Sequence, residues 1–225
     1  MVRTLNKDRI LGVLAGQDLN PKRVAKWAES AEFVVAADGG ANLLYDEGII
    51  PDVAIGDFDS IYDSTKTAQT TLVHAPDQDT SDCEKLLDYV RSIGGERITL
   101  CSVEGDHLDH LMATFHAAAK SPLDVRLVVR RGIVQLLKGP VECFYDLPVG
   151  TRLSLLPITV CSIVDLHGVQ WPLVDVELSP AGMFSLSNRT TGPVQVSITS
   201  GVAALFLSHP SLELPHWSGD LSPIP

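Results

Sequence analysis

The sequence has no long apolar run, no tract rich in lysine and arginine, and no closely paired cysteines. A membrane-spanning helix needs roughly 18 to 20 apolar residues in succession, and none of the 225 residues lies in such a run, so we expect no membrane association. The opening MVRTLNKDRI lacks the apolar segment of a signal peptide. Cys83, Cys101, Cys143 and Cys161 are far apart, which favours buried thiols over metal ligands. We expect a reduced, cytoplasmic protein.

Positive charge is scarce as well. The chain has 28 acidic against 17 basic residues and a formal net charge of -11. Without a basic stripe to follow a phosphate backbone, nucleic acid is not an expected partner. A nucleotide remains compatible with this charge if a divalent cation stands between carboxylate and phosphate. The acidic balance also suits a cationic ligand.

Two common nucleotide-binding motifs are missing. The first expected strand ends in Gly16 without a GxGxxG pattern, and there is no GxxxxGK[ST] loop. Their absence disfavours a dinucleotide site and a P-loop kinase.

The first part of the chain alternates apolar runs with amphipathic stretches. Asn20-Pro21 is typical of a helix start, and Ser81 with Glu84 forms a capping box before a helix that Gly94-Gly95 would end. Strands are expected at 10–15, 33–37, 53–55, 71–74, 98–103 and 125–129. This alternation predicts an α/β domain over residues 1–138, with a mostly parallel sheet and crossover helices.

After Lys138-Gly139-Pro140 only short strand-like runs remain, separated by Gly, Pro, Ser and Asn. They include 152–157, 160–166, 174–178, 194–199 and 202–207. This spacing predicts a smaller antiparallel β-sandwich domain over residues 139–225.

Acidic residues follow four successive strands of the first domain. Asp38 follows the second, Asp57 and Asp59 the third, the stretch 77–82 the fourth, and 104–109 the fifth. Ligands of parallel sheets bind beyond the carboxyl ends of the strands. Asp77 alone is explained by a turn, but several carboxylates at one edge repel one another unless a cation neutralises them.

Mg²⁺ is the cation that these oxygen ligands favour, because it binds through one or two carboxylates and substrate phosphates. Asp57 and Asp59 are two residues apart, so in an extended segment both side chains project to the same side. We predict that Asp57, Asp59 and Asp82 bind the metal. Gly39, Gly40 and Gly56 would let the backbone approach a ligand closely. Lys85 either reaches a phosphate or lies on a solvated helix face.

In order along the chain, these segments resemble thiamine pyrophosphokinase. The strong matches are ADGGAN (37–42), GIIPDVAIGDFDS (48–60), DQDTSDCEK (77–85) and GDHLDH (105–110), and the looser ones are GVQW (168–171) and SLSN (185–188). The resemblance implies a homodimeric enzyme with an α/β catalytic domain and a thiamine-binding β-sandwich. It implies transfer of pyrophosphate from ATP to thiamine, giving thiamine diphosphate and AMP.

The resemblance also implies roles for individual residues. Asp57, Asp59 and Asp82 fall on the magnesium-binding positions, with Asp38 close to the phosphates, and these four form the expected catalytic set. Gln78, Ser187 and Asn188 fall where thiamine is held. The expected ATP contacts are Gly39, Asn42, Ser60, Lys85, His107 and Asp109. Asp38 and Asp109 are the candidates for the base that accepts the hydroxyl proton, and spacing does not choose between them.

This chain departs from the family pattern at three places. Ser81 stands where the family usually has threonine, and His107 where it usually has arginine, so a permanent cation is replaced by a titratable ring. Some members stack thiamine on a tryptophan near the C-terminus, where this chain reads GVAALFL. Phe206 and Trp171 are the candidates to replace that tryptophan.

Three other functions compete with this interpretation. The acceptor could be another hydroxymethyl heterocycle such as a pterin. GDFDS could instead be the DxD motif of a metal-dependent nucleotide-sugar transferase, although ADGGAN and DQDTSD would then have no role. Finally, the acidic cluster could bind a metal in a protein without catalytic activity.

Overall fold

The computed structural model describes residues 9–59, 67–105 and 107–208. The chain divides into two compact units, Met1–Arg130 and Arg131–Pro225, which we call the α/β unit and the β unit. The predicted boundary followed residue 138. In the structure β7 (Gly132–Lys138) belongs to the β unit, because it pairs along its whole length with β13 (Val202–Ser208).

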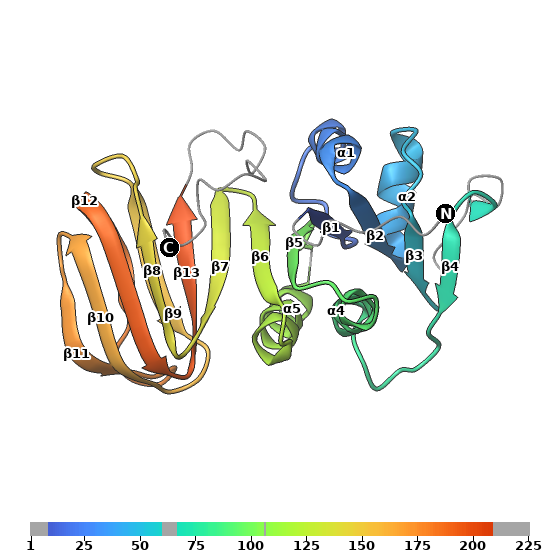
Figure 1. The fold of residues 1–225 in the computed structure, drawn as a ribbon. Helices are drawn as coiled ribbons and strands as arrows, with labels where there is room; N and C mark the ends of the chain where they lie inside the picture. The colour runs from blue at the N-terminus through green and yellow to red at the C-terminus, as the bar shows by residue number, and fades with distance from the viewer. Residues whose placement is uncertain (1–8, 60–66, 106, 209–225) are drawn as a thin grey trace. The chain divides into compact units, whose positions relative to one another are not determined.

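The α/β unit contains a parallel sheet with the strand order β6-β5-β1-β2-β3-β4. Its strands are β1 (Ile10–Val13), β2 (Phe33–Ala37), β3 (Val53–Gly56), β4 (Thr71–His74), β5 (Arg97–Cys101) and β6 (Asp124–Val129). Its helices are α1 (Pro21–Ser30), α2 (Asp38–Asp46), α4 (Asp82–Ser92) and α5 (Leu108–Lys120). Helices α1 and α2 cover one face of the sheet, and α4 and α5 cover the other (Figure 1). The predicted α/β fold is confirmed.

Local sequence signals set the helix ends. The Asn20 side chain accepts a hydrogen bond from the Lys22 backbone N–H at 3.0 Å, with Pro21 at the first helical position. At α4 the predicted capping box forms: the Glu84 N–H donates to Ser81 Oγ at 3.3 Å, and the Ser81 N–H donates to Glu84 Oε2 at 3.0 Å. Both predicted helix starts are therefore confirmed.

The strand order reverses at β1. The chain adds β2, β3 and β4 on one side of β1, and then returns to place β5 on its other side. In such sheets the crevice for ligands lies outside the carboxyl ends of the strands, at this point of reversal. The loops that follow β1 and β5 therefore belong to the expected ligand-binding edge.

One expectation about the sheet was wrong. We expected strand 71–74 to be covered on both faces, but β4 is the edge strand of the described sheet and most of its residues are exposed. Four consecutive residues of suitable type do not reveal whether a strand lies at the centre or the edge of its sheet.

The β unit is antiparallel throughout its described strands. Besides β7 and β13 it contains β8 (Val141–Tyr145), β9 (Arg152–Pro157), β10 (Cys161–Val169), β11 (Leu173–Leu178) and β12 (Ser185–Ser200). The first part of β12 pairs with β9, and its second part lies between β8 and β10. Strand β12 thus joins two sheets around one apolar core, as a sandwich requires.

Parts of this unit lack a clear local signal in the sequence. Strands β7 and β8 were not predicted, and only 194–199 was predicted within the much longer β12. Pro193, Gly192 and the preceding polar residues look like a break, yet they lie within the strand near a shift of register in its pairing with β10.

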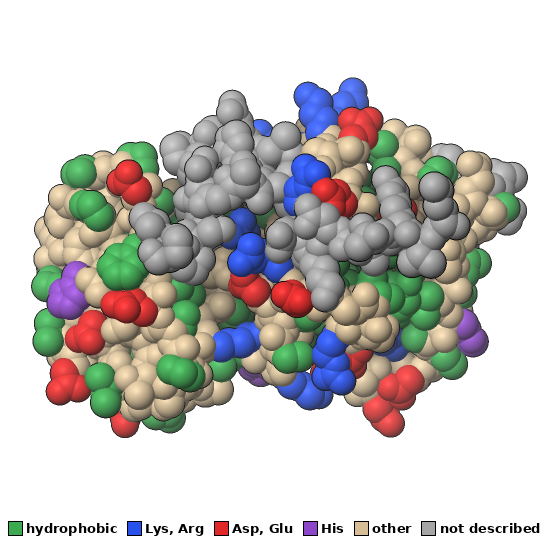
Figure 2. Space-filling view, in the orientation of Figure 1, with side chains coloured by type: hydrophobic (Ala, Val, Ile, Leu, Met, Phe, Trp, Pro, Cys, Tyr) green, Lys and Arg blue, Asp and Glu red, His purple; other side chains and the backbone are tan. Residues whose placement is uncertain are grey.

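The surface carries charges of both signs (Figure 2), and the four cysteines are buried. On the face shown in Figure 2, acidic and basic side chains of the α/β unit are interspersed. Cys83, Cys101, Cys143 and Cys161 are all buried free thiols, as predicted, and burial raises the pKa of Cys83 to about 12. In the part of the chain that the structure describes, every helix is too short or too polar to cross a membrane.

Candidate active site

A cleft of about 920 Å³ opens at the carboxyl edge of the parallel sheet. Segments that follow β1, β2, β3, β4 and β5 all contribute to its lining, as do the first residues of α4 and α5. The cleft is therefore formed by loops that are distant in sequence and adjacent at the sheet edge.

Three carboxylates converge in this cleft. Asp38, Asp57 and Asp59 each offer an oxygen atom, and these atoms lie within 4.8 Å of one another. Within the described residues, this is the one group of three or more His, Cys, Asp or Glu side chains with such spacing. Oxygen atoms this close can share a single divalent cation, which would also offset their repulsion.

The backbone brings these side chains together in a way that the sequence did not indicate. In an extended segment Asp57 and Asp59 would project to the same side, but β3 ends at Gly56 and Phe58 has a φ of +66°. The chain therefore turns between Asp57 and Asp59, and the Asp59 N–H donates to Asp57 Oδ1 at 3.4 Å. Convergence of the two carboxylates comes from a turn and not from strand alternation.

Asp38 reaches the same place from the start of α2, immediately after β2, and is only 5% exposed. A carboxylate at a helix N-terminus is stabilised by the helix dipole. A Cβ atom at Gly56 would lie 2.8 Å from Asp38 Cβ, so glycine there permits the close approach of the two segments. At Gly40 a Cβ would lie 2.3 Å from the Val13 carbonyl oxygen. Both glycines thus serve packing of the protein against itself, where we expected an approach to a ligand.

Hydrogen bonding keeps Asp57 ionised. Its pKa is held below the usual value, first because the carboxylate accepts the Asp59 N–H, and further through the side chains of Asp38 and Gln78. The Gln78 amide donates to Asp57 Oδ2 at 3.2 Å. A metal-binding carboxylate must be deprotonated, and these contacts favour that form.

Asp82 lines the same cleft but lies outside the group of three converging carboxylates. It is the first residue of α4, and its Oδ1 lies 3.7 Å from Lys85 Nζ. The Lys85 side chain is only 8% exposed, which rules out the solvated helix face that we considered for it. A buried ammonium beside the cleft is well placed to meet an anionic ligand.

The other residues predicted for ATP are distributed unevenly. Gly39, His107 and Asp109 line the cleft. Asn42 lies further along α2 and is not among the lining residues, and Ser60 falls outside the described residues.

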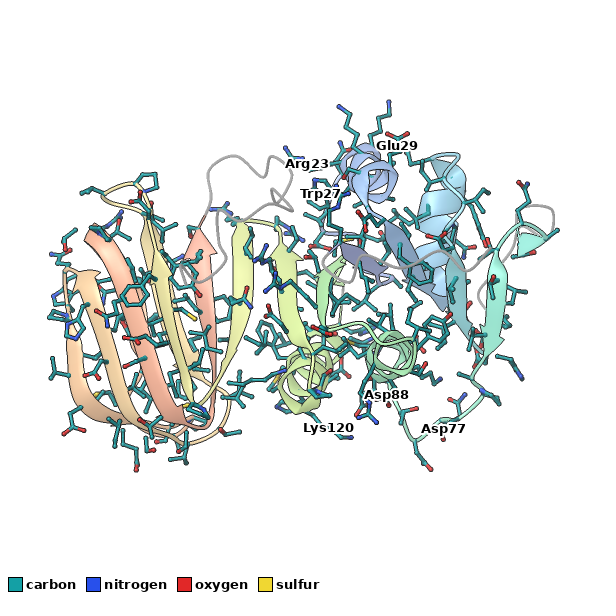
Figure 3. The ribbon with its side chains drawn as sticks, viewed as in Figure 1. Arg23, Trp27, Glu29, Asp77, Asp88 and Lys120 are labelled. Atoms are coloured by element: carbon teal, nitrogen blue, oxygen red, sulfur yellow. The ribbon has the colours of Figure 1, made fainter. Side chains whose placement is uncertain are left out.

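Asp77 plays the turn role expected of it, and Figure 3 shows it on the connection between β4 and α4. Its carboxylate accepts hydrogen bonds from Thr80 Oγ1 at 2.7 Å and from the Asp79 N–H at 3.1 Å. A second contact steadies the next helix: Lys120, labelled at the end of α5, donates to Glu84 Oε1 at 3.1 Å. Asp77 thus shapes the loop that carries Gln78, and the Lys120 contact joins α5 to the start of α4.

Of the residues predicted to hold thiamine, Gln78 lies in the cleft, whereas Ser187 and Asn188 lie on β12 of the β unit. The Asn188 side chain is 1% exposed and bonds internally. It accepts the Trp171 N–H at 3.1 Å and donates to the Trp171 carbonyl at 2.7 Å. Asn188 therefore fixes the backbone of Trp171, whose own side chain is 57% exposed.

Residues 14–17 and 102–103 also line the cleft, although they were not predicted to do so. They carry no motif, and only the reversal of strand order at β1 marks them. Asp18 follows the first of these segments. Burial raises its pKa to about 6, and the carboxylate of Glu104 adds a smaller repulsion in the same direction. Asp18 is therefore a poorly hydrated carboxyl group whose charged form is disfavoured.

Comparison with known proteins agrees with these observations. Residues 24–129 match the family model described as "Thiamin pyrophosphokinase, catalytic domain", and residues 145–203 match "Thiamin pyrophosphokinase, vitamin B1 binding domain". Thiamine pyrophosphokinase 1 of Arabidopsis thaliana is 29% identical over 194 residues, covering 71% of this chain and 72% of that protein. Thiamin pyrophosphokinase 1 of Caenorhabditis elegans is 27% identical over 217 residues, covering 88% and 87%.

Solved structures show the same fold. Thiamine pyrophosphokinase from Bacillus subtilis superposes with a TM-score of 0.74 at 21% identity, covering 90% of this chain and 100% of that one. The enzyme from Candida albicans gives a TM-score of 0.73 at 18% identity, covering 89% and 88%. Since the two family models together match well over half of the residues, in the order found in the structure, the chain belongs to the thiamine pyrophosphokinase family.

Proposed function

We propose that this protein transfers a pyrophosphoryl group from ATP to the hydroxyl of thiamine, giving thiamine diphosphate and AMP. One observation supports this most strongly. In a chain of this family, Asp38, Asp57 and Asp59 converge within 4.8 Å in a cleft large enough for a nucleotide. Family membership favours this reaction over a pterin acceptor, over a nucleotide-sugar transferase, and over a binding protein without activity.

The carboxylates suit a hard divalent cation, and we propose Mg²⁺. The converging side chains offer only oxygen ligands, without the nitrogen or sulfur ligands that zinc favours. Asp57 and Asp59 would hold the ion together with Asp38, and Asp82, which lines the same cleft, would join them. When bound, the ion would offset the negative charge that the phosphates carry during transfer.

The remaining chemistry falls to the protein itself. The thiamine oxygen bonds to the β-phosphorus, the bond from that phosphorus to the α-phosphate oxygen breaks, and AMP leaves. We propose that Lys85 and His107 contact the phosphates, together with Gly39 and Asp109, which also line the cleft. The family resemblance also implies ATP contacts at Asn42, which does not line the cleft, and at Ser60, which lies outside the described residues. Positioning and charge compensation supply most of the rate enhancement in such transfers.

The hydroxyl proton needs an acceptor. Asp38 and Asp109 both line the cleft, and we propose one of them as the base. The variants Asp38→Asn and Asp109→Asn test this, because loss of the base should remove the acidic limb of the pH profile of kcat. Asp38 is also a proposed metal ligand, so both variants are assayed at saturating Mg²⁺, where a lost ligand alone leaves that limb in place.

Thiamine carries a permanent positive charge, which suits acidic and aromatic surroundings. We propose that Gln78 and Ser187 contact it, and that Asn188 acts by fixing Trp171. Trp171 is the better candidate for stacking, because its side chain is 57% exposed, whereas Phe206 is partly buried in β13 between β7 and β9.

We also propose a cytoplasmic homodimer. Buried free thiols support a reducing compartment. The β unit exposes Trp171, Val174 and Leu186, and exposed apolar side chains of this kind suit a contact between subunits. Light scattering during size-exclusion chromatography measures the mass directly, and a monomer at micromolar concentration would contradict the dimer.

The test of the function is product analysis. Purified protein is incubated with ATP, Mg²⁺ and thiamine, and nucleotides and thiamine esters are separated by chromatography. We expect equal amounts of AMP and thiamine diphosphate, and neither product after chelation of the metal. Release of ADP, or faster AMP formation with a hydroxymethylpterin than with thiamine, would contradict the proposal.

A further inference from the structure

We propose that the stacked rings of Phe58 and His74 hold the carboxylate loop in its metal-binding shape, so that both are positioning residues for the divalent cation. This inference rests on the proposed function, because it concerns the same three carboxylates. It assigns a role to two residues that the proposed chemistry leaves unused.

The carboxylate loop, residues 56–59, turns where a strand would continue. Oxygens of Asp38, Asp57 and Asp59 lie within 4.8 Å of one another. The turn between Asp57 and Asp59 occurs at Phe58, whose φ is +66°. The convergence of the ligands therefore depends on the conformation of this one residue.

The second step is that this conformation needs support. A positive φ is unfavourable for any residue with a Cβ atom, and for a bulky side chain it is an outlier that surrounding contacts must maintain. The hydrogen bond from the Asp59 N–H to Asp57 Oδ1 is long, at 3.4 Å, and the Gln78 amide donates to Asp57 Oδ2 at 3.2 Å; both contacts are exposed. Both act on the carboxylate of Asp57, and neither acts on the side chain of Phe58, the residue with the unfavourable φ.

The third step is the contact that Phe58 does make. Its ring stacks on the imidazole of His74, with centroids 5.9 Å apart and planes inclined by 29°. Offset stacks at this separation are favourable. His74 is the last residue of β4 and pairs in register with Gly56, the last residue of β3. The Ala75 N–H also donates to the Gly56 carbonyl at 2.8 Å. The imidazole is thus anchored to the sheet at the level where the carboxylate loop begins.

The experiment measures metal binding apart from turnover. Binding of Mn²⁺ to the metal-free protein is followed by the electron paramagnetic resonance signal of the free ion, and turnover is measured against Mg²⁺ concentration. His74→Ala and Phe58→Ala should each raise the Kd for Mn²⁺ about two- to tenfold, the range expected for loss of one aromatic stack. The Mg²⁺ concentration for half-maximal turnover should rise equally, with the KM for thiamine unchanged.

Two further variants separate positioning from a general structural effect. His74→Phe keeps a ring for stacking and should restore the Kd to within about twofold of the wild type. Phe58→Gly removes the ring but also removes the penalty of a positive φ, so it should bind Mn²⁺ more tightly than Phe58→Ala. Leu72→Ala is the matched control, since Leu72 is an exposed side chain of the same strand, two residues before His74.

The inference is overturned if either His74→Ala or Phe58→Ala binds Mn²⁺ as the wild type does, or if Leu72→Ala weakens binding as much as His74→Ala. Failure of the proposed function has a different signature. In that case the wild type itself would form no AMP from ATP and thiamine, whereas here the wild type is active and only the response to the substitutions is at stake.

Discussion

Replacing Asn188 by alanine should destabilise the β unit and release the turn that carries Trp171. The Asn188 amide is buried and makes its contacts within the protein. Besides its two bonds to the Trp171 backbone, it accepts the Arg189 N–H at 2.9 Å and donates to Ser185 Oγ at 3.1 Å. Alanine would remove all four interactions at once.

The size of the effect follows from these contacts. A hydrogen bond contributes about 1 kcal/mol net to stability, and a buried polar group left without its hydrogen-bond partner costs more than that. The backbone groups of Trp171 and Arg189 that bond to Asn188 are only partly buried, so water can replace some of the lost hydrogen bonds. We therefore expect a loss of about 3 kcal/mol in the free energy of unfolding of the β unit.

Urea unfolding followed by circular dichroism measures this loss, and hydrogen exchange locates it. The amides of Trp171 and Arg189 should exchange faster in Asn188→Ala, and the KM for thiamine should rise if Trp171 contacts the substrate. Gln195→Ala is a suitable control on the same strand, because it removes only an exposed bond to Glu142 and should change stability by less than about 0.5 kcal/mol. A loss below about 1 kcal/mol in Asn188→Ala, with unchanged exchange at Trp171, would refute this reasoning.

Three other predictions concern the α/β unit. Asp57→Asn should lower kcat by at least about a hundredfold, because a metal ligand is lost. The metal-free variant should stay folded, because repulsion among the carboxylates is relieved. Near wild-type turnover at saturating Mg²⁺ would refute the assignment. Gly40→Ala should cost about 1 to 3 kcal/mol, because its Cβ would meet the Val13 carbonyl oxygen at 2.3 Å; thermal unfolding measures this, and an unchanged Tm would contradict it. Asp18→Asn should stabilise the protein at pH 7 and much less at pH 4. The raised pKa of Asp18, about 6, means that the folded state binds more protons than the unfolded state between about pH 4 and 6, so its contribution to stability falls as pH rises through that window. After allowance for solvent screening we expect roughly 1 kcal/mol at pH 7, and equal urea midpoints for variant and wild type at both pH values would exclude the effect.

Local sequence determined the elements whose signals lie within a few residues. The cap at Asn20 and the capping box of Ser81 and Glu84 were predicted because a helix start depends on side chains two or three positions away. The alternation of strands and helices likewise predicted the parallel sheet, because crossover connections leave few other arrangements. Strand β12 was predicted only in part, because Pro193 and its polar neighbours are tolerated only through pairing with distant strands.

The candidate site was likewise predicted from the sequence only in part. The sequence by itself placed acidic residues after successive strands and so indicated a cation-binding edge, because the carboxyl ends of parallel strands must meet. Only the tertiary structure decided which carboxylates converge: Asp38 joins Asp57 and Asp59, while Asp82 lies beside Lys85. That choice depends on the turn at Phe58 and on the close approach allowed at Gly56. Distances between loops are set by packing across the sheet, which no local pattern encodes.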